Sequence, residues 1–203
     1  MQSNTISNLD DNFLSNLTGL EELYLQDNHI SALKDSNLTY GQNALKILQI
    51  HNNKILSLPS SFLSPLSELD TLFLHENQIC CTFEGFSILN SKIRYAKLGS
   101  NKFTQLSNDF LNDTSLLRYL HLDNNQIQSD LEFSGASENN ILEQLYLQNN
   151  EISAISSKFM NIFQNMRTLH LGKNKLTSLP NPLGLPFGSK LQNFFFGENQ
   201  ISG

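Results

Sequence analysis

The sequence is poor in charge, and particularly in basic residues. Its 203 residues include 13 Lys and Arg against 19 Asp and Glu, which gives a net charge of −6 at pH 7. The basic residues form no run or cluster, so the sequence lacks the electrostatic footprint of proteins that bind nucleic acid, heparin-like chains or anionic membranes. We therefore expect no nucleic-acid partner.

Long apolar runs and cysteines are also scarce. No apolar stretch reaches the length of about 18 residues that a membrane-spanning helix needs, so we expect no membrane insertion by this segment. The opening residues MQSNTISNLDD lack the basic and apolar regions of a secretion signal. Cys80 and Cys81 are adjacent and belong to no C-x-x-C motif, so we interpret them as thiols near a turn rather than as a zinc or redox site.

What the sequence does contain is an 11-residue pattern that returns eight times. Apolar residues occupy positions 1, 4, 6 and 11 of the pattern and Asn occupies position 9, as in LEELYLQDNHI and LRYLHLDNNQI. The copies begin at residues 20, 45, 69, 93, 117, 142, 166 and 191, so successive copies are 24 or 25 residues apart. Every apolar position holds an apolar residue, which chance does not produce at an overall apolar content of 39%.

The physical meaning of this pattern follows from its alternation. Apolar residues at positions 4 and 6 predict a short strand with one buried face, and equal spacing stacks such strands in parallel about 4.8 Å apart. One repeat cannot cover its own apolar face, so its neighbours must do so. Buried Asn amides need partners, and we predict that they bond backbone groups of their own and the adjacent turn. This asparagine ladder comprises Asn28, Asn53, Asn77, Asn101, Asn125, Asn150, Asn174 and Asn199.

The pattern resembles that of the leucine-rich repeat family, whose repeats run about 20–29 residues, and the resemblance covers essentially the whole chain. Between the motifs, ILSLPSSFLSPLSEL and LTSLPNPLGLPFGSKL are similar to the 24-residue subclass of extracellular receptor and matrix proteins. Thr82 and the irregular repeat after Asn125 depart from that subclass. The resemblance implies an α/β repeat solenoid. It would be a right-handed superhelix with a curved parallel β-sheet on its concave face and irregular or short-helical segments on its convex side.

We expect one leucine-rich repeat domain over residues 1–203, made of a partial repeat at 1–19 followed by the eight repeats. Asn4, Thr5 and Ile6 fit the tail of an earlier repeat. Solenoids need polar caps at their ends, and none is recognisable here, because Phe194 and Phe196 of the last repeat face no further repeat. This indicates a fragment of a longer protein. The alternative is a small protein that dimerises end to end or has an unfamiliar cap.

The resemblance implies a module for protein–protein recognition, without a cofactor, whose protein ligand binds the concave sheet. The residues between the buried strand positions point outward, and many are aromatic, a residue class enriched where interfaces carry their energy. The alternative is that aromatic residues simply favour strands. The predicted ligand-binding residues are Tyr24, His51, Phe73, His75, Tyr95, Tyr119, His121, Tyr146, His170 and Phe195.

Catalysis and metal binding have weaker support. No G-x-S-x-G, P-loop or Rossmann motif is present, and we predict that the chain is not an enzyme. His51 and His75 occupy one repeat position, and a metal would need a third ligand such as Glu76; solvated surface histidines are the simpler interpretation, and we predict no metal site. Such histidines would make binding depend on pH near 6–7.

The resemblance places the chain in a receptor, adhesion or matrix protein with a signalling role, in an extracellular or cell-surface ectodomain. Glycosylation sequons at Asn16, Asn37 and Asn112 are compatible with a secreted glycoprotein. The alternatives are a cytoplasmic scaffold or regulatory domain, and the sensor repeats of a larger signalling enzyme. Ligand identity and oligomeric state stay open.

Overall fold

A computed structural model describes most of the chain. The described residues are 1–11, 13–34, 44–59, 62–82, 92–106, 110–111, 114–128, 130–131, 141–156, 159, 164–179 and 189–202. Each of the eight repeats contributes one three-residue strand to a single sheet whose order is β1-β2-β3-β5-β7-β8-β9-β10. The strands are β1 (Glu22–Tyr24), β2 (Ile47–Gln49), β3 (Thr71–Phe73), β5 (Tyr95–Lys97), β7 (Tyr119–His121), β8 (Gln144–Tyr146), β9 (Thr168–His170) and β10 (Asn193–Phe195).

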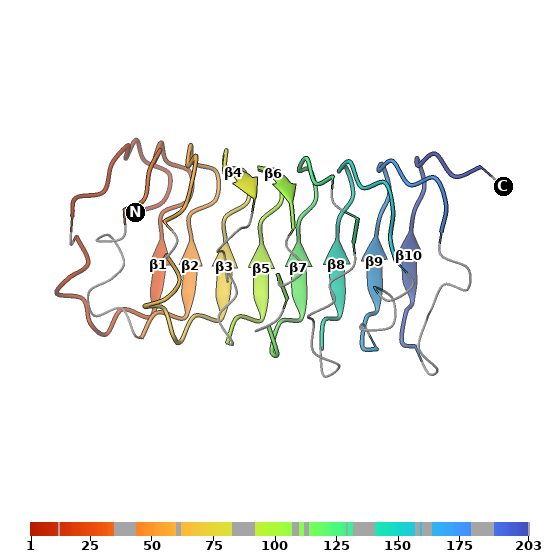
Figure 1. Cartoon of the computed structure of the whole chain (residues 1–203). Coiled ribbons are helices and arrows are strands. Elements are labelled where there is room, and N and C mark those ends of the chain that lie inside the picture. The colour runs from red at the N-terminus through yellow and green to blue at the C-terminus, as the bar shows by residue number, and fades with distance from the viewer. Residues whose placement is uncertain are drawn as a thin grey trace.

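All neighbouring strands in this sheet are parallel, and they share one register. The central residue of each strand pairs with the central residue of the next, as Leu48 does with Leu72. A slip by one residue would turn the buried leucine of a strand toward solvent, so burial fixes the register. Figure 1 shows the resulting row of strands, with the two termini at opposite ends. The chain is therefore a parallel β-solenoid in which each repeat forms one coil.

The core lies on one side of this sheet. In β2, Leu48 is fully buried while Ile47 and Gln49 on either side are partly exposed. The buried residues form one continuous cluster from Leu9 to Leu176, so each coil packs on the coils before and after it. Burying a Leu side chain stabilises the fold by about 1.5–3 kcal/mol, which makes this stacking the main stabilising interaction.

The ladder asparagines lie at the turn that follows each strand. Asn53 is typical: its Nδ2 donates to the carbonyl oxygens of Ile50 at 3.2 Å and of Leu25 in the preceding coil at 2.9 Å. Its Oδ1 accepts from the Ile30 N–H, also in the preceding coil, at 2.9 Å. One side chain thus satisfies backbone groups of two coils, because an amide can donate and accept at once. Seven of the eight are buried: Asn28, Asn53, Asn77, Asn101, Asn125, Asn150 and Asn174.

The residue before each ladder asparagine has a left-handed backbone. Its φ lies between 51° and 58° in Asp27, Asn52, Glu76, Ser100, Asn124, Asn149, Lys173 and Glu198. This conformation is costly for L-residues, least so for Asn and Asp, and it persists where surrounding structure over-determines it. Here the asparagine ladder holds the conformation in place, because the sharp turn brings the asparagine amide within hydrogen-bonding distance of backbone groups of its own and the preceding coil.

The N-terminal residues repeat this turn without contributing a strand to the sheet. Ser3 has a φ of 53°, like the residues before the other ladder asparagines. The Ile6 N–H donates to Asn28 Oδ1 at 3.0 Å, as the Ile30 N–H does to Asn53. Residues 1–6 therefore cover the first coil with the same backbone contacts that the later coils make.

The side of the solenoid away from the sheet is described only in part. It contains a two-stranded parallel sheet of β4 (Cys80–Thr82) and β6 (Lys102–Gln105) and a bridge between Leu131 and Ile155. Many of the segments that we expected to be irregular or short-helical lie outside the described residues. The handedness of the superhelix and the curvature of its sheet stay predictions. No helix in the described part of the chain is long and apolar enough to cross a membrane.

Candidate functional site

The side of the sheet that faces away from the core carries three columns of side chains, which we call the outward face. The first and last residues of each strand are positions 3 and 5 of the 11-residue pattern. Because the register is constant, each of these two positions forms a column of side chains across the coils. A third column comes from position 7, just after each strand. It consists of Gln26, His51, His75, Gly99, Asp123, Gln148, Gly172 and Gly197.

Aromatic rings stack across neighbouring strands of the outward face. Tyr95 and Tyr119 lie with ring centroids 4.8 Å apart and planes 6° from parallel. His121 stacks on Tyr146 at 4.3 Å, and His170 stacks on Phe195 at 4.9 Å. These distances are those of favourable offset stacking, which contributes about 0.5–1.5 kcal/mol per pair beyond burial. The stacks extend from β5 to β10 and hold the rings in fixed positions.

A second aromatic group lies toward the N-terminal end of the sheet. His51 and His75 stack at 4.2 Å, and Phe73 meets both edge-on at 6.3 and 5.9 Å. The Lys97 ammonium lies 4.8 Å from the centroid of the Phe73 ring, within the range of a cation–π interaction. Lys97 belongs to β5, the strand that also carries Tyr95.

The ten predicted ligand-binding residues therefore share one face, but they differ in how far they are exposed to solvent. Tyr95 and Phe195 are exposed, with 38% and 49% of their surface accessible, and the other eight are partly buried. Tyr24 is separate from the stacks and donates its hydroxyl to Glu22 Oε2 at 2.8 Å. That hydrogen bond raises the pKa of Tyr24 above its ordinary value. Ligand binding at these positions stays a prediction.

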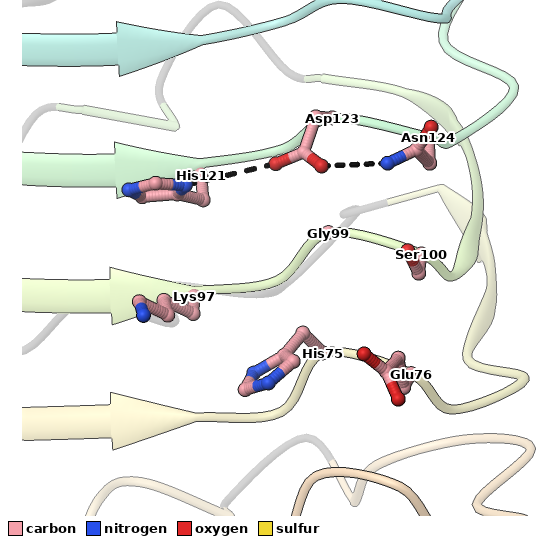
Figure 2. Close-up of a pocket in the computed structure, with 8 residues that line it drawn as sticks. All are labelled: His75, Glu76, Lys97, Gly99, Ser100, His121, Asp123 and Asn124. Carbon is pink, nitrogen blue, oxygen red and sulfur yellow. Dashed lines mark hydrogen bonds and ion pairs between the residues drawn. The ribbon is translucent and has the colours of Figure 1, made fainter.

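The sequence reasoning overlooked the glycines in the column at position 7. At Gly99 this column lacks a side chain, and the outward face has a depression there. We call it the Gly99 depression, and its volume is about 300 Å³. Figure 2 shows the residues that line it: His75, Glu76, Lys97, Gly99, Ser100, His121, Asp123 and Asn124. The signal was available in the sequence, because a Gly in a column otherwise filled by His, Gln and Asp predicts a missing side chain.

Asp123 is the anchored charge of this depression. Its carboxylate accepts from Asn124 Nδ2 at 2.7 Å and lies 3.7 Å from His121 Nδ1. A Cβ at Gly99 would come within 2.8 Å of Asp123 Oδ1, so only glycine leaves room for this carboxylate. Burial raises the pKa of Asp123, but the neighbouring His121 and the hydrogen bonds from its own backbone and from Asn124 lower the pKa by more, so the net pKa is below the ordinary value. Asp123 is therefore ionised at neutral pH.

A second hollow lies three strands further along the same column. This Gly172 depression, of about 350 Å³, is lined by Gln148, Asn149, His170, Gly172, Lys173, Phe195, Gly197 and Glu198. The Gly172 N–H donates to His170 Nδ1 at 3.3 Å, which fixes the ring at its wall. A Cβ at Gly172 would lie 3.0 Å from His170 Cε1, so the absence of a side chain again makes the space.

His75, on the outward face, does not titrate where the sequence suggested. Burial first, then the charges of His51 and Lys97, lowers the pKa of His75 to about 4. Burial also lowers the pKa of His51, although Asp27 and Glu76 oppose the shift, and it lowers that of His170. The predicted pH dependence near pH 6–7 is therefore wrong for His75. Burial favours the neutral form of His51 and His170 as well, because charging their rings costs desolvation.

Metal ligation by the histidines has no geometry to support it. His51 and His75 are parallel rings whose Nδ1 atoms are buried and have no hydrogen-bond partner among the described residues. In-plane lone pairs on parallel stacked rings do not converge on one point. Across the described ranges, no three His, Cys, Asp or Glu side chains are grouped so that they could hold a metal ion.

A row of charges crosses the sheet where the strands begin. Lys46 pairs with Glu21 at 2.8 Å, Arg94 pairs with Asp70, and Glu143 accepts from Arg118. Each pair joins adjacent coils. As exposed or half-exposed ion pairs they contribute about 0–1 kcal/mol each, so they reinforce the register rather than create it.

Two further candidate residues, Asn16 and Cys80, lie outside the strands of the outward face. Asn16, the first residue of one sequon, is exposed in the turn before the first repeat, whereas Asn37 and Asn112 lie outside the described residues. Cys80 begins β4 with an exposed side chain.

Comparisons with known proteins give no match in sequence but clear matches in structure. No protein-family model and no curated protein matches the sequence. A leucine-rich repeat protein of Leptospira interrogans is 27% identical over 91% of this chain, with a TM-score of 0.78. An internalin of Listeria monocytogenes is 23% identical over 89%, with a TM-score of 0.67. Toll of Drosophila, solved in complex with Spätzle, is 24% identical over 92%, with a TM-score of 0.79.

These neighbours confirm the leucine-rich repeat resemblance and the solenoid. The chain spans 45% of the Leptospira protein, 49% of the internalin and 26% of the Toll chain. At this level of identity the internalin and Toll likenesses concern the fold alone.

Proposed function

We propose, from the premise that this chain is a leucine-rich repeat solenoid, that it binds a partner protein on the outward face of its sheet. The observation that carries the proposal is the row of stacked ring pairs between β5 and β10, of which Tyr95 and Phe195 are exposed to solvent. Aromatic side chains dominate the binding energy of protein interfaces. In this proposal the chain recognises a protein and catalyses no reaction.

Two physical features favour this face as the binding surface. The rings are already ordered by stacking, as between Tyr95 and Tyr119, so binding costs little side-chain entropy. The backbone beneath them is fixed by the parallel register and the asparagine ladder, which places the side chains at constant spacing. A rigid face whose rings are already ordered suits a partner that is folded, or one that lies extended along the sheet.

The binding test compares substitutions on and off the outward face. Tyr95→Ser with Tyr119→Ser removes one stack, and we expect it to weaken the affinity for a purified partner by about 100-fold or more, since each aromatic hot spot contributes about 2 kcal/mol. The matched control is Leu17→Ser with Leu56→Ser, which removes two apolar side chains that are 48% and 53% exposed outside the sheet. The dissociation constant is measured by calorimetry.

The control variant should bind as the unchanged chain does, and both variants should keep the far-ultraviolet circular dichroism of the solenoid. If the tyrosine variant kept its affinity while folded, the outward face would not be the binding surface. Equal losses in both variants would show that the substitutions act through stability.

We further propose that the chain is part of an extracellular receptor, adhesion or matrix protein. The support is the similarity to the 24-residue subclass and the exposure of Asn16 within its sequon. Expression through a eukaryotic secretory pathway should attach a glycan at Asn16, which peptide mass analysis detects, and Asn16→Gln should remove it. A secreted, folded chain without any glycan at its three sequons would contradict the assignment as a glycoprotein.

A further inference from the structure

The two depressions of the outward face lie at a definite spacing. Gly99 follows β5 and Gly172 follows β9, and the strands between them are β7 and β8. Three strand intervals of about 4.8 Å separate the depressions by about 14 Å along the solenoid axis. Because both belong to the column at position 7, the line that joins them runs along that axis.

An extended peptide has a matching repeat. Its backbone advances about 3.3 Å per residue, and its side chains alternate between two faces. Residues i and i+4 therefore point the same way and lie about 13 Å apart, whereas i+2 falls near 7 Å and i+6 near 20 Å. A peptide that runs along the solenoid axis can fill both depressions only with residues four apart.

The Gly99 depression is suited to a cation. Glu76 and Asp123 lie on either side of Gly99 in Figure 2, and both contribute carboxylates to its lining. The Lys97 ammonium also belongs to the lining but is directed away from Gly99 toward the ring of Phe73, so two carboxylates face one ammonium. A guanidinium or ammonium placed here would make charge-assisted hydrogen bonds with Asp123, the stronger kind of hydrogen bond.

The Gly172 depression is suited to an apolar ring. Its Phe195 wall is 49% exposed and stacks on His170. Its two charged residues, Lys173 and Glu198, pair with each other at 3.7 Å, so the rim carries no net charge. An aromatic side chain entering it would extend the existing stack of two rings.

We propose that the partner presents an extended segment along the solenoid axis, with Arg or Lys in the Gly99 depression and an aromatic residue four positions away in the Gly172 depression. This inference rests on the proposed function and names the kind of partner that the face takes. The partner segment needs no secondary structure of its own, because the spacing is that of an extended chain.

The test uses synthetic peptides in which only the spacing changes. The reference probe is acetylated Thr-Arg-Thr-Ser-Thr-Phe-Thr, whose Arg and Phe are four residues apart. The comparison set has the same composition with spacings of two, three, five and six residues, and each peptide is also made in reverse order. Isothermal titration calorimetry gives the dissociation constants. We expect spacing four, in one of the two orders, to bind at least about tenfold tighter than the others.

Two variants of the chain test which depression binds which end of the peptide. Asp123→Asn should weaken the reference probe about tenfold, yet leave a probe with Gln in place of Arg unchanged; its control is Asp130→Asn on the other side of the solenoid. Gly172→Gln fills the second depression with the residue that Gln26 and Gln148 provide in other coils. Its control is Gly19→Gln, where an added Cβ meets nothing within 4 Å.

Affinities that do not depend on spacing, or no binding by any probe at millimolar concentration, would overturn the inference. Loss of binding in the controls equal to that in the variants would do the same. A protein partner that still depends on Tyr95 and Tyr119 would in that case leave the proposed function standing, so the two failures are distinguishable. If a second copy of this chain or a carbohydrate were the true occupant, the peptides would not bind and the inference would fall.

Discussion

The fifth and the eighth repeats carry the same pattern in two different environments. In the fifth, Asn125 donates to Leu98 O in the preceding coil at 3.2 Å, and in the eighth Asn199 donates to Leu171 O at 2.9 Å. Both also accept a backbone N–H of the preceding coil. Yet Leu122 is fully buried whereas Phe196, at the same repeat position, is 41% exposed.

The difference separates two contributions that the sequence pattern combines. The ladder hydrogen bonds of a coil reach back to the coil before it, so both repeats form them. Burial of the apolar residues requires a coil on each side, and among the described residues the eighth repeat has one on a single side. The ladder hydrogen bonds therefore need only a preceding coil, whereas full burial of the apolar residues needs a following coil as well.

The largest expected effect comes from removing an apolar residue in each environment. Leu122→Ala should lower the free energy of unfolding by about 2–5 kcal/mol, because it leaves a cavity between two coils. Phe196→Ala should lower it by about 1 kcal/mol, since much of that ring is already in water. Urea unfolding followed by circular dichroism measures both, and similar losses would refute the dependence on the following coil.

Replacing the ladder asparagines gives a smaller difference. Asn125→Leu removes the side-chain acceptor of the Phe103 N–H and one of the two amide donors to each of the Leu98 and Leu122 carbonyls in a buried turn, at a cost of about 3 kcal/mol. Asn199→Leu frees groups that are partly exposed and that water can satisfy, so the cost should be about 1 kcal/mol. Thermal denaturation of both variants tests this, and Asn→Asp at the same positions shows whether the amide N–H is the required group.

Acid should destabilise the interior histidine group more than the end of the sheet. The pKa of His75 is about 4 in the folded chain, below its ordinary value of 6.5, so the unfolded chain binds more protons between these values. Stability then falls as the pH drops from 6.5 to 4, by about 1–3 kcal/mol for this residue.

His75→Gln should flatten the pH profile of stability over that range, because Gln26 and Gln148 show that the column accepts Gln. The matched substitution His170→Gln, nearer the last coil, should flatten it less. The expectation fails if His75→Gln retains the full slope.

The smallest expected effect concerns the left-handed residue of each turn. Lys173 has a φ of 55°, a conformation that Asn adopts at lower cost, so Lys173→Asn should raise stability by about 0.5–1 kcal/mol. Lys175→Asn is the control, because it too removes one exposed ion pair, that of Lys175 with Glu151. A gain in stability in both variants, or in neither, would contradict the interpretation that the left-handed conformation of Lys173 is strained.

The sequence predicted the solenoid because its stabilising interactions are local and periodic. Apolar residues such as Leu48 and Leu72 mark the buried side, and constant spacing predicts the parallel register. The Gly99 and Gly172 depressions were overlooked because they depend on what a neighbouring coil places beside a glycine, such as the Asp123 carboxylate. The titration of His75 depends likewise on its burial among side chains such as His51 and Phe73, which the sequence does not reveal.

The most direct test of the binding face is site-specific photo-crosslinking. The photoreactive residue p-benzoylphenylalanine is introduced at Tyr119 on the outward face and, in a separate variant, at Leu56 outside the sheet. After irradiation with the purified partner, the variant at Tyr119 should form the covalent adduct and the variant at Leu56 should not. An adduct from Leu56 alone, or equal adducts from both positions, would contradict recognition through the outward face.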